Sequence, residues 1–387
     1  MDTSSPTIRC TSSGVALFSA GLLAVGVVLA ASASASMGES NFATRHLLRG
    51  VGRQGLFAVL GFLVMLAVAR IGHGFWRWRE RSWFQPSVWL GLAALACCVA
   101  VVLPGVGAAH HGARRWLHVS DGWGVAFQPS EMAKIALVVL LAALIASAGD
   151  RVSRLRAGVL PLIGVIALFA GLVGVEDFGT AALLATVGVA MLWVGGARPG
   201  HLVLPVIPGA LAMGALVIAR PYRVERLTTF LDIWRDPRGA GYHAIQSLVT
   251  IASGGWYGVG LGAGVGKRGY VPESHSDFVF SMLCEETGVV GGVLVILLYA
   301  GLLWCGWRAF RQARTRFGRT LAFGITFMVV LQAIMNIAVV TVCAPTKGIS
   351  LPLVSAGGSG ILFLCVALGL LMSVARASER QPAENLP

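Results

Sequence analysis

The apolar residues of this 387-residue chain gather into separate blocks that are long enough to cross a lipid bilayer. A helix needs about 20 predominantly apolar residues to cross roughly 30 Å of hydrocarbon. Only 12% of the residues are charged and 56% are hydrophobic, whereas charged residues make up about a quarter of an ordinary soluble domain. The pattern therefore predicts an all-α polytopic membrane protein and excludes a soluble globular domain.

Ten of these blocks are long enough to be transmembrane spans. They are predicted at approximately 14–36, 53–72, 86–107, 129–148, 157–175, 179–196, 200–220, 278–306, 320–342 and 358–376. Together they form one membrane domain over 14–376, and we expect 1–13 and 377–387 to be disordered ends. An even number of spans places both ends on one side of the membrane.

The basic residues decide which side that is. If both ends are cytoplasmic, the inner connecting segments hold more than half of the 30 basic residues and the short outer loops hold few. The positive-inside rule therefore predicts cytoplasmic ends. The same residues explain the formal net charge of +13, and because they lie between apolar blocks we expect no nucleic acid partner.

One connection, 221–277, is much longer than the others, and this orientation places it on the outer face. A long loop in a compact protein is usually functional. Within it, 243–253 predicts a helix at the membrane interface. The glycine-rich run 255–265 predicts a turn that folds back onto the bundle, because glycine permits the backbone conformations that such a turn needs.

Asp277 is the candidate catalytic residue, because it lies where the long loop meets the eighth span. A carboxylate at the boundary between water and lipid suits a general base. Glu273 and His275 precede it and indicate a polar site. An aspartate before an apolar helix is also a common N-cap, and position alone favours that alternative.

A second group of polar residues opens the fourth span. Pro129, Ser130 and Glu131 are typical of a helix start. Lys134 lies inside an apolar run, where an ionisable group costs a few kcal/mol or more and indicates a functional site. Glu131 is its predicted partner, one turn earlier. A pair that only fixes two helices explains the pattern equally well.

Positive charge is expected at two further places on the outer face. Arg114 and Arg115 stand beside Trp116 and suit a phosphate or pyrophosphate group, although binding of bulk anionic lipid is the alternative. Lys347 lies in 345–359, where prolines and glycines predict an irregular loop folded back into the bundle.

The other polar groups in apolar surroundings are interpreted as contacts between helices. They are the turn 176–180, the pair Glu285 and Glu286 in the eighth span, and Gln332 and Asn336, four residues apart in the ninth.

These blocks, in this order and at this spacing, resemble the SEDS family of bacterial envelope proteins (shape, elongation, division and sporulation). The similar segments are GARRW (112–116), FQPSEMAK (127–134), DFGT (177–180), FLDIWRDPRGAGYHAIQSL (230–248), GVGLG (258–262), VPESHSDFVF (271–280), EETG (285–288) and PTKGISLPLVSAGGS (345–359). GARRW and PTKG resemble the division branch, FtsW and its sporulation relative, more than the elongation branch, RodA.

The resemblance implies a ten-helix glycosyltransferase of the bacterial cytoplasmic (inner) membrane. Such an enzyme polymerises lipid II into peptidoglycan at the division septum and releases undecaprenyl pyrophosphate. The implied partners are nascent glycan, membrane lipid, a class B penicillin-binding transpeptidase and other divisome membrane proteins. Asp277 matches the family's essential acidic residue, and Lys134 matches its functional lysine.

The remaining site residues are expected to contact the substrate or to supply positive charge to the leaving pyrophosphate, with a divalent cation such as Mg or Mn left open. They are Arg114, Arg115, Glu131, Lys267, Arg268, Glu273, His275, Lys347 and Ser355.

The chain departs from the family pattern at three places, and two other functions stay open. The usual SYGGSS reads SAGGSG here, with Ala356 and Gly360; His111 stands where asparagine is common; and the proline that usually precedes Asp177 is missing. The first alternative is a lipid II flippase or other lipid transporter, whose path would use the polar residues of the fourth and eighth spans. The second is a noncatalytic division scaffold, which would tolerate Asp277→Asn.

Overall fold

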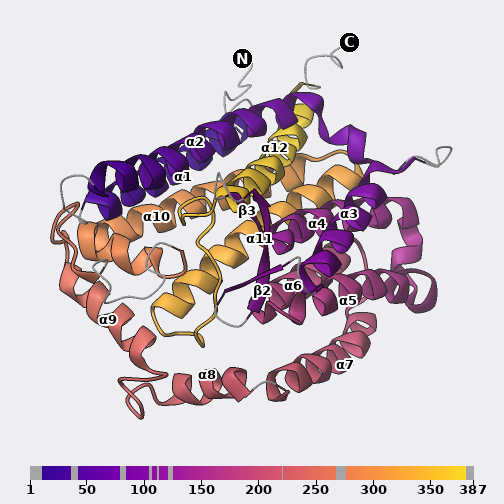
Figure 1. The fold of residues 1–387 in the computed structure, drawn as a ribbon. Helices are drawn as coiled ribbons and strands as arrows, with labels where there is room; N and C mark the ends of the chain where they lie inside the picture. The colour runs from indigo at the N-terminus through magenta and orange to yellow at the C-terminus, as the bar shows by residue number, and fades with distance from the viewer. Residues whose placement is uncertain are drawn as a thin grey trace.

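Apolar helices make up most of the fold (Figure 1). The computed structural model describes residues 11–35, 42–78, 84–103, 107–110, 113–120, 125–219, 221–266 and 276–380. Within them, seven helical segments are long and apolar enough to cross a membrane. Their helices are α1 (Thr11–Ala35), α2 (Phe42–Ile71), α4 (Pro129–Ala148), α5 (Leu160–Gly174), α10 (Val279–Gln312), α11 (Arg316–Val340) and α12 (Gly358–Arg380).

Three shorter apolar helices bring the described structure to one apolar helix for each predicted span. They are α3 (Pro86–Val102), α6 (Phe178–Val194) and α7 (Pro199–Ile218). Short 3-10 turns follow α2 at His73–Trp76 and α4 at Gly149–Ser153, and a π-helical turn at Leu155–Val159 leads into α5. The polytopic helical fold is confirmed, while the crossing of all ten spans stays a prediction.

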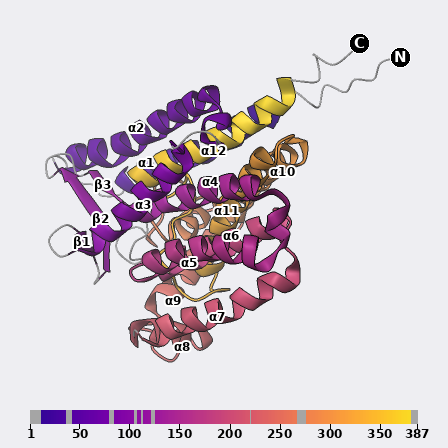
Figure 2. The same cartoon turned by 90° about the vertical axis from the view of Figure 1, so that its right-hand side faces the viewer.

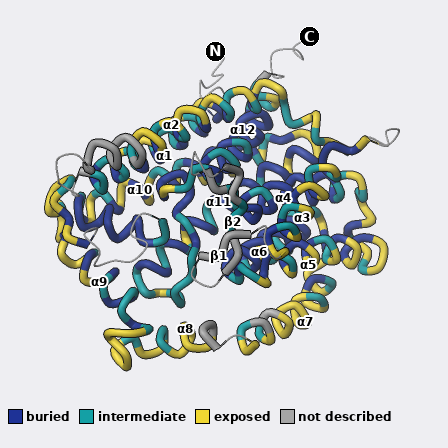
Figure 3. The backbone as a smooth tube through the Cα atoms, in the orientation of Figure 1, coloured by how far each residue is buried: buried dark blue, intermediate teal, exposed yellow. Residues whose placement is uncertain are grey.

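The core lies around α4 and α12, which are buried along most of their length (Figure 3). The helix α12 packs against α2 and α1, and α11 packs against α10 and α4. The helices α2 and α7 lie on opposite sides of the bundle (Figures 1 and 2) and present exposed apolar side chains such as Leu63 and Leu211. Exposed leucines on outer helices are those that lipid would cover.

The described chain is helical closer to its ends than the sequence predicts. The N–H of Ser12 and its Oγ donate to the two carboxylate oxygens of Glu379, at 2.9 and 2.7 Å. This contact caps the start of α1 with a residue of α12. Residues 11–13 and 377–380, expected to be disordered, are helical. The rest of both ends lies outside the described residues.

A three-stranded antiparallel sheet lies between α3 and α4, where the sequence predicts only a loop. It is formed by β1 (Gly107–His110), β2 (Ala113–Ser120) and β3 (Val125–Phe127), in the order β1-β2-β3. Figure 2 shows it at the end of the bundle opposite the two chain ends. The span predicted to reach 107 ends as a helix at Val102, because Leu103 precedes a proline and takes an extended backbone.

The long connection 221–277 is also more structured than the sequence predicts. It holds α8 (Pro221–Leu231), which was not predicted, and α9 (Tyr242–Gly254), which confirms the helix expected at 243–253. The glycine-rich run after α9 folds back onto the bundle, as expected. Gly258, Gly260 and Gly262 all have φ between 80° and 102°, a region that other residues rarely adopt.

The run is held at a break in α10 that centres on Gly288, whose φ of 71° and ψ of −170° are outside the helical region. The break frees carbonyl groups that a continuous helix would pair. Two of them, on Glu285 and Glu286, accept hydrogen bonds from the N–H groups of Val259 and Gly260, at 2.9 and 3.1 Å. The N-terminal piece of α10 and the glycine-rich run therefore satisfy each other's main-chain hydrogen-bonding groups.

Gly288→Ala is expected to destabilise the protein by about 1–3 kcal/mol, because the backbone conformation at this position is one that essentially only glycine adopts. A Cβ here would also overlap the backbone of Trp256. Gly164→Ala is the matched control, because Gly164 lies in α5 with open space around it and alanine favours a helix. Thermal unfolding in detergent measures both; equal melting temperatures would contradict the expectation.

Candidate functional site

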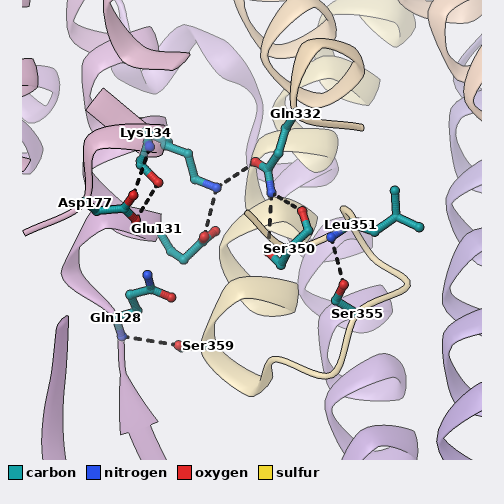
Figure 4. A network of polar contacts seen from close by, with 10 residues as sticks. Gln128, Glu131, Lys134, Asp177, Gln332, Ser350, Leu351, Ser355 and Ser359 are labelled. Carbon is teal, nitrogen blue, oxygen red and sulfur yellow. Dashed lines mark hydrogen bonds and ion pairs between the residues drawn. The ribbon is translucent and has the colours of Figure 1, made fainter. Parts of the chain in front are cut away.

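A network of buried polar side chains joins α4 to α11 (Figure 4). Lys134 lies on the second turn of α4 and is 2% exposed. Its Nζ donates to Glu131 Oε1 at 2.9 Å, which confirms the predicted pair, and to Gln332 Oε1 at 2.7 Å. Gln332 is a second partner that the sequence did not assign, because 198 residues separate it from Lys134. The ammonium group is thus compensated inside the bundle.

The Gln332 side chain carries the network on to the loop between α11 and α12. Its Nε2 donates to the carbonyl oxygen of Ser350 at 2.9 Å. One amide therefore accepts from Lys134 and donates to the main chain of the loop. This loop is irregular, as predicted, and is buried from Leu351 to Ser355.

Asn336, one turn further along α11, contacts the segment that holds Asp277. Its Nδ2 donates to the carbonyl oxygens of Asp277 and Ile349, at 2.8 and 2.7 Å. It therefore links the start of α10 to the same loop that Gln332 holds. Within the described residues, Asn336 Oδ1 is buried and has no hydrogen-bond partner.

The neighbouring carbonyl, that of Ser276, is held from the other side. Ser355 Oγ donates to Ser276 O at 2.5 Å and accepts from the N–H of Leu351 at 2.7 Å. Both peptide groups around Asp277 are thus fixed by side chains from distant parts of the chain. Asp277 itself is half-buried. The helix α10 begins at Val279, with Phe278, the residue after Asp277, at the N-cap position.

Lys347 lines a cavity between α6, α7, α8 and the loop. Its Nζ lies 5.2 Å from the centroid of the Phe178 ring. Burial lowers the pKa of the Lys347 ammonium, and the negative charge of Asp177 partly opposes this shift. Arg226 of α8 lines the same cavity, so two cationic side chains meet there. Arg226 was not predicted as a site residue.

Asp177 also lines a second, mainly apolar cavity, together with Glu176, where the end of α3, the start of α4 and the end of α5 meet. Its carboxylate caps α6 and accepts from the N–H and Oγ1 of Thr180, at 3.1 and 2.8 Å. The residues around this second cavity include Val101, Val102, Pro129, Leu172 and Val173. A charged cavity and an apolar one thus share one residue, Asp177.

Glu285 and Glu286 hold the glycine-rich run and α1. Glu285 Oε1 accepts from the N–H groups of Val265 and Gly266, at 2.8 and 3.1 Å. Glu286 accepts from the Oγ of Ser32 in α1, at 2.6 Å. Both carboxylates are buried. Glu286 therefore makes the contact between helices that the sequence predicts, whereas Glu285 contacts the glycine-rich run and not another helix.

The remaining predicted site residues are less fully placed. Arg114 and Arg115 lie on β2, but their side chains are outside the described part of the structure. Lys267, Arg268, Glu273 and His275 fall outside the described residues altogether. No group of three or more His, Cys, Asp or Glu side chains in the described ranges could hold a metal ion.

The amino-acid sequence matches a known family along almost the whole chain. The profile of the FtsW/RodA/SpoVE cell cycle proteins matches residues 14–380. The chain belongs to the FtsW/RodA/SpoVE family. The family membership expected from the sequence is confirmed, and with the apolar helices it makes the protein a multi-pass membrane protein.

Two relatives from this family are similar along most of their length. The chain is 40% identical to the probable peptidoglycan glycosyltransferase FtsW of Thioalkalivibrio sulfidiphilus, over 94% of this chain and 89% of that protein. It is 35% identical to stage V sporulation protein E of Bacillus subtilis, over 92% of this chain and 94% of the relative. The FtsW name supports the glycosyltransferase activity expected from the sequence.

Solved FtsW/RodA/SpoVE structures have the same fold. A chain of a peptidoglycan synthase complex that coordinates polymerization and crosslinking superposes with a TM-score of 0.72 and 28% identity, covering 95% of this chain and 98% of that one. The rod shape determining protein RodA of Thermus thermophilus superposes with a TM-score of 0.64 and 24% identity, covering 94% and 96%. At that identity the second match supports the fold alone.

Proposed function

We propose that this chain is a peptidoglycan glycosyltransferase that polymerises lipid II, with Asp277 as its general base. The observation that carries the proposal is the fixed position of Asp277, whose flanking carbonyls are held by Asn336 and Ser355. A general base must be placed within hydrogen-bond reach of the proton that it accepts. Family membership and the relatives named as glycosyltransferases support the reaction class.

In the proposed reaction, the sugar 4-hydroxyl of one lipid-linked disaccharide is the nucleophile. Asp277 accepts the hydroxyl proton as the oxygen attacks the anomeric carbon of the growing chain. The new glycosidic bond forms while the bond from that carbon to the pyrophosphate oxygen breaks. Undecaprenyl pyrophosphate leaves with the electron pair, and its negative charge needs stabilisation by nearby cations.

Lys347 and Arg226 line a cavity in which such charge can be stabilised, beside the carboxylate of Asp177. We propose that this cavity receives the pyrophosphate, and that the adjoining apolar cavity at Leu172 and Val173 receives the first part of a lipid tail. The roles of Arg114, Arg115, Lys267 and Arg268 stay predictions. Because no metal-binding cluster fits the described residues, we derive no step through a divalent cation.

The setting of the reaction is proposed from the relatives. One relative is named FtsW, as in the division branch, and another is named stage V sporulation protein E, as in the sporulation branch. The 28% identical structure is a chain of a peptidoglycan synthase complex. We therefore propose a protein of the bacterial cytoplasmic membrane, with both ends in the cytoplasm, that acts at the division septum. A class B penicillin-binding transpeptidase and other divisome proteins are its proposed partners.

Polymerisation of labelled lipid II tests the function. The purified protein is assayed with and without a co-purified class B transpeptidase, and glycan strands are resolved by length. Polymer from the wild type supports the proposal. If the wild type with its partner makes no polymer but moves lipid II across vesicle membranes, the protein is a transporter. If it does neither and still binds the transpeptidase, the scaffold function replaces the enzyme.

The buried position of Lys347 predicts that affinity for the substrate falls at alkaline pH. Because burial lowers its pKa, the ammonium loses its proton at a lower pH than an exposed lysine does, so attraction for pyrophosphate fades earlier as the pH rises. The KM for lipid II is expected to increase on the alkaline side. Lys347→Arg should remove this increase, because a guanidinium stays charged. An alkaline limb that is unchanged in the arginine variant would contradict the assignment.

A further inference from the structure

We infer that Gln332 and Asn336 of α11 are positioning residues that hold Asp277 and Lys134 in a fixed relation through the loop 349–355. The inference rests on the proposed function and deepens it. Neither side chain is expected to touch substrate. Each acts through a main-chain carbonyl or a charged group that belongs to the proposed site.

The spacing of the two amides on α11 makes this possible. Residues four apart lie on the same face of a helix, one turn above the other. Gln332 reaches Lys134 on one side and Ser350 on the other. Asn336 reaches Asp277 and Ile349. Both amides therefore bond to adjacent residues of one loop, 349 and 350. Each also has a second hydrogen bond, to Lys134 for Gln332 and to Asp277 for Asn336.

The loop completes the connection through Ser355. Its hydroxyl donates to the carbonyl of Ser276 and accepts from the N–H of Leu351. The segment 276–277 is thus tied to the loop directly, by Ser355, and indirectly, by Asn336. Rotation of the Asp277 backbone would break hydrogen bonds to two different elements, α11 and the loop, so the backbone from which its carboxylate projects is held in place.

The hydrogen bonds of Asn336 favour positioning over simple stability. Both of these hydrogen bonds are donated by Nδ2 to main-chain carbonyls. An apolar side chain of similar size could fill the same space but could hold neither carbonyl. The two donors are the property that the position requires.

The test compares Asn336→Asp with Thr326→Val. Aspartate has the shape of asparagine but lacks its two donor protons, so it cannot hold the carbonyls of Asp277 and Ile349 when ionised. Thr326 is the matched control, because it is a buried polar residue on the same helix whose hydroxyl bonds only to Ala322 O within that helix, at 2.7 Å. Ser355→Ala serves as a second variant in case Asn336→Asp does not fold.

Two measurements are made on the full chain with its transpeptidase. In lipid II polymerisation, Asn336→Asp and Ser355→Ala are expected to lower kcat by about 10- to 100-fold with little change in KM, because a misplaced base slows the reaction and not binding. In hydrogen–deuterium exchange without substrate, both variants are expected to raise amide exchange in 276–283 and 349–355. Thr326→Val should change neither result.

The exchange measurement separates this inference from the proposed function. Faster exchange together with a lower kcat supports the positioning role. Unchanged exchange in both variants, or a loss that appears in KM alone, overturns it even if the wild type is an active polymerase. An inactive wild type defeats the proposed function, and unchanged exchange in the same preparation would then defeat the structural link as well.

Discussion

Replacing Asp277 by asparagine is expected to lower glycan polymerisation by about 10²- to 10⁴-fold, because an amide cannot accept the proton of the sugar hydroxyl. Asparagine is close in size to aspartate, so the backbone contacts of the segment should persist. These contacts are the bonds that Asn336 and Ser355 donate to the carbonyls of 277 and 276. Lipid II binding is therefore expected to remain.

The measurement is the rate of glycan strand formation at equal amounts of folded protein, with binding of labelled lipid II as a second readout. Asp232→Asn is the matched control, because Asp232 is an exposed aspartate of the same connection, 221–277, that accepts from the N–H of Trp234. Wild-type rates from Asp277→Asn would rule out Asp277 as the base. A loss of equal size in both variants would point to the connection 221–277 as a whole.

Replacing Lys134 by methionine is expected to destabilise the protein by about 3–5 kcal/mol, because Glu131 would be left as a buried charge without its cation. Both side chains are almost inaccessible, with exposures of 2% for Lys134 and 9% for Glu131. Gln332 would also lose the donor to its Oε1. The loss is measured as a lower melting temperature in detergent.

The double variant Glu131→Gln with Lys134→Met separates charge from packing. Removing both charges avoids the unpaired carboxylate, so most of the lost stability is expected to return. Its polymerisation activity then reports on function alone. Full activity in the stable double variant would show that the pair only fixes helices, the alternative that the sequence left open.

The spans and the Glu131–Lys134 pair could be predicted because both depend on neighbours in the sequence. Hydropathy locates each apolar helix, and a lysine in an apolar run needs a partner within a turn or on a facing helix. The fold-back of the glycine-rich run was predictable for the same reason, since it follows from residues that permit positive φ.

The site contacts could not be predicted because they join residues far apart in the chain. Asn336 and Asp277 are 59 residues apart, and Ser355 and Ser276 are 79. The sequence marked Gln332 and Asn336 as polar contacts between helices, but periodicity does not say which main-chain group an amide will meet. The break at Gly288 was missed because a single glycine is tolerated in most helices.

The loop between α11 and α12 is held to α11 through its main-chain carbonyl groups. This determines which loop residues can be substituted without loss of the contacts. Gln332 and Asn336 bond to main-chain oxygens of 350 and 349, which every residue supplies. Ala356 is exposed, so the aromatic ring usual at that position can be lost without loss of these bonds. An exposed loop position such as Ala356 can therefore vary without loss of these bonds, while the three donor side chains, on Gln332, Asn336 and Ser355, are the ones whose loss would dismantle the site.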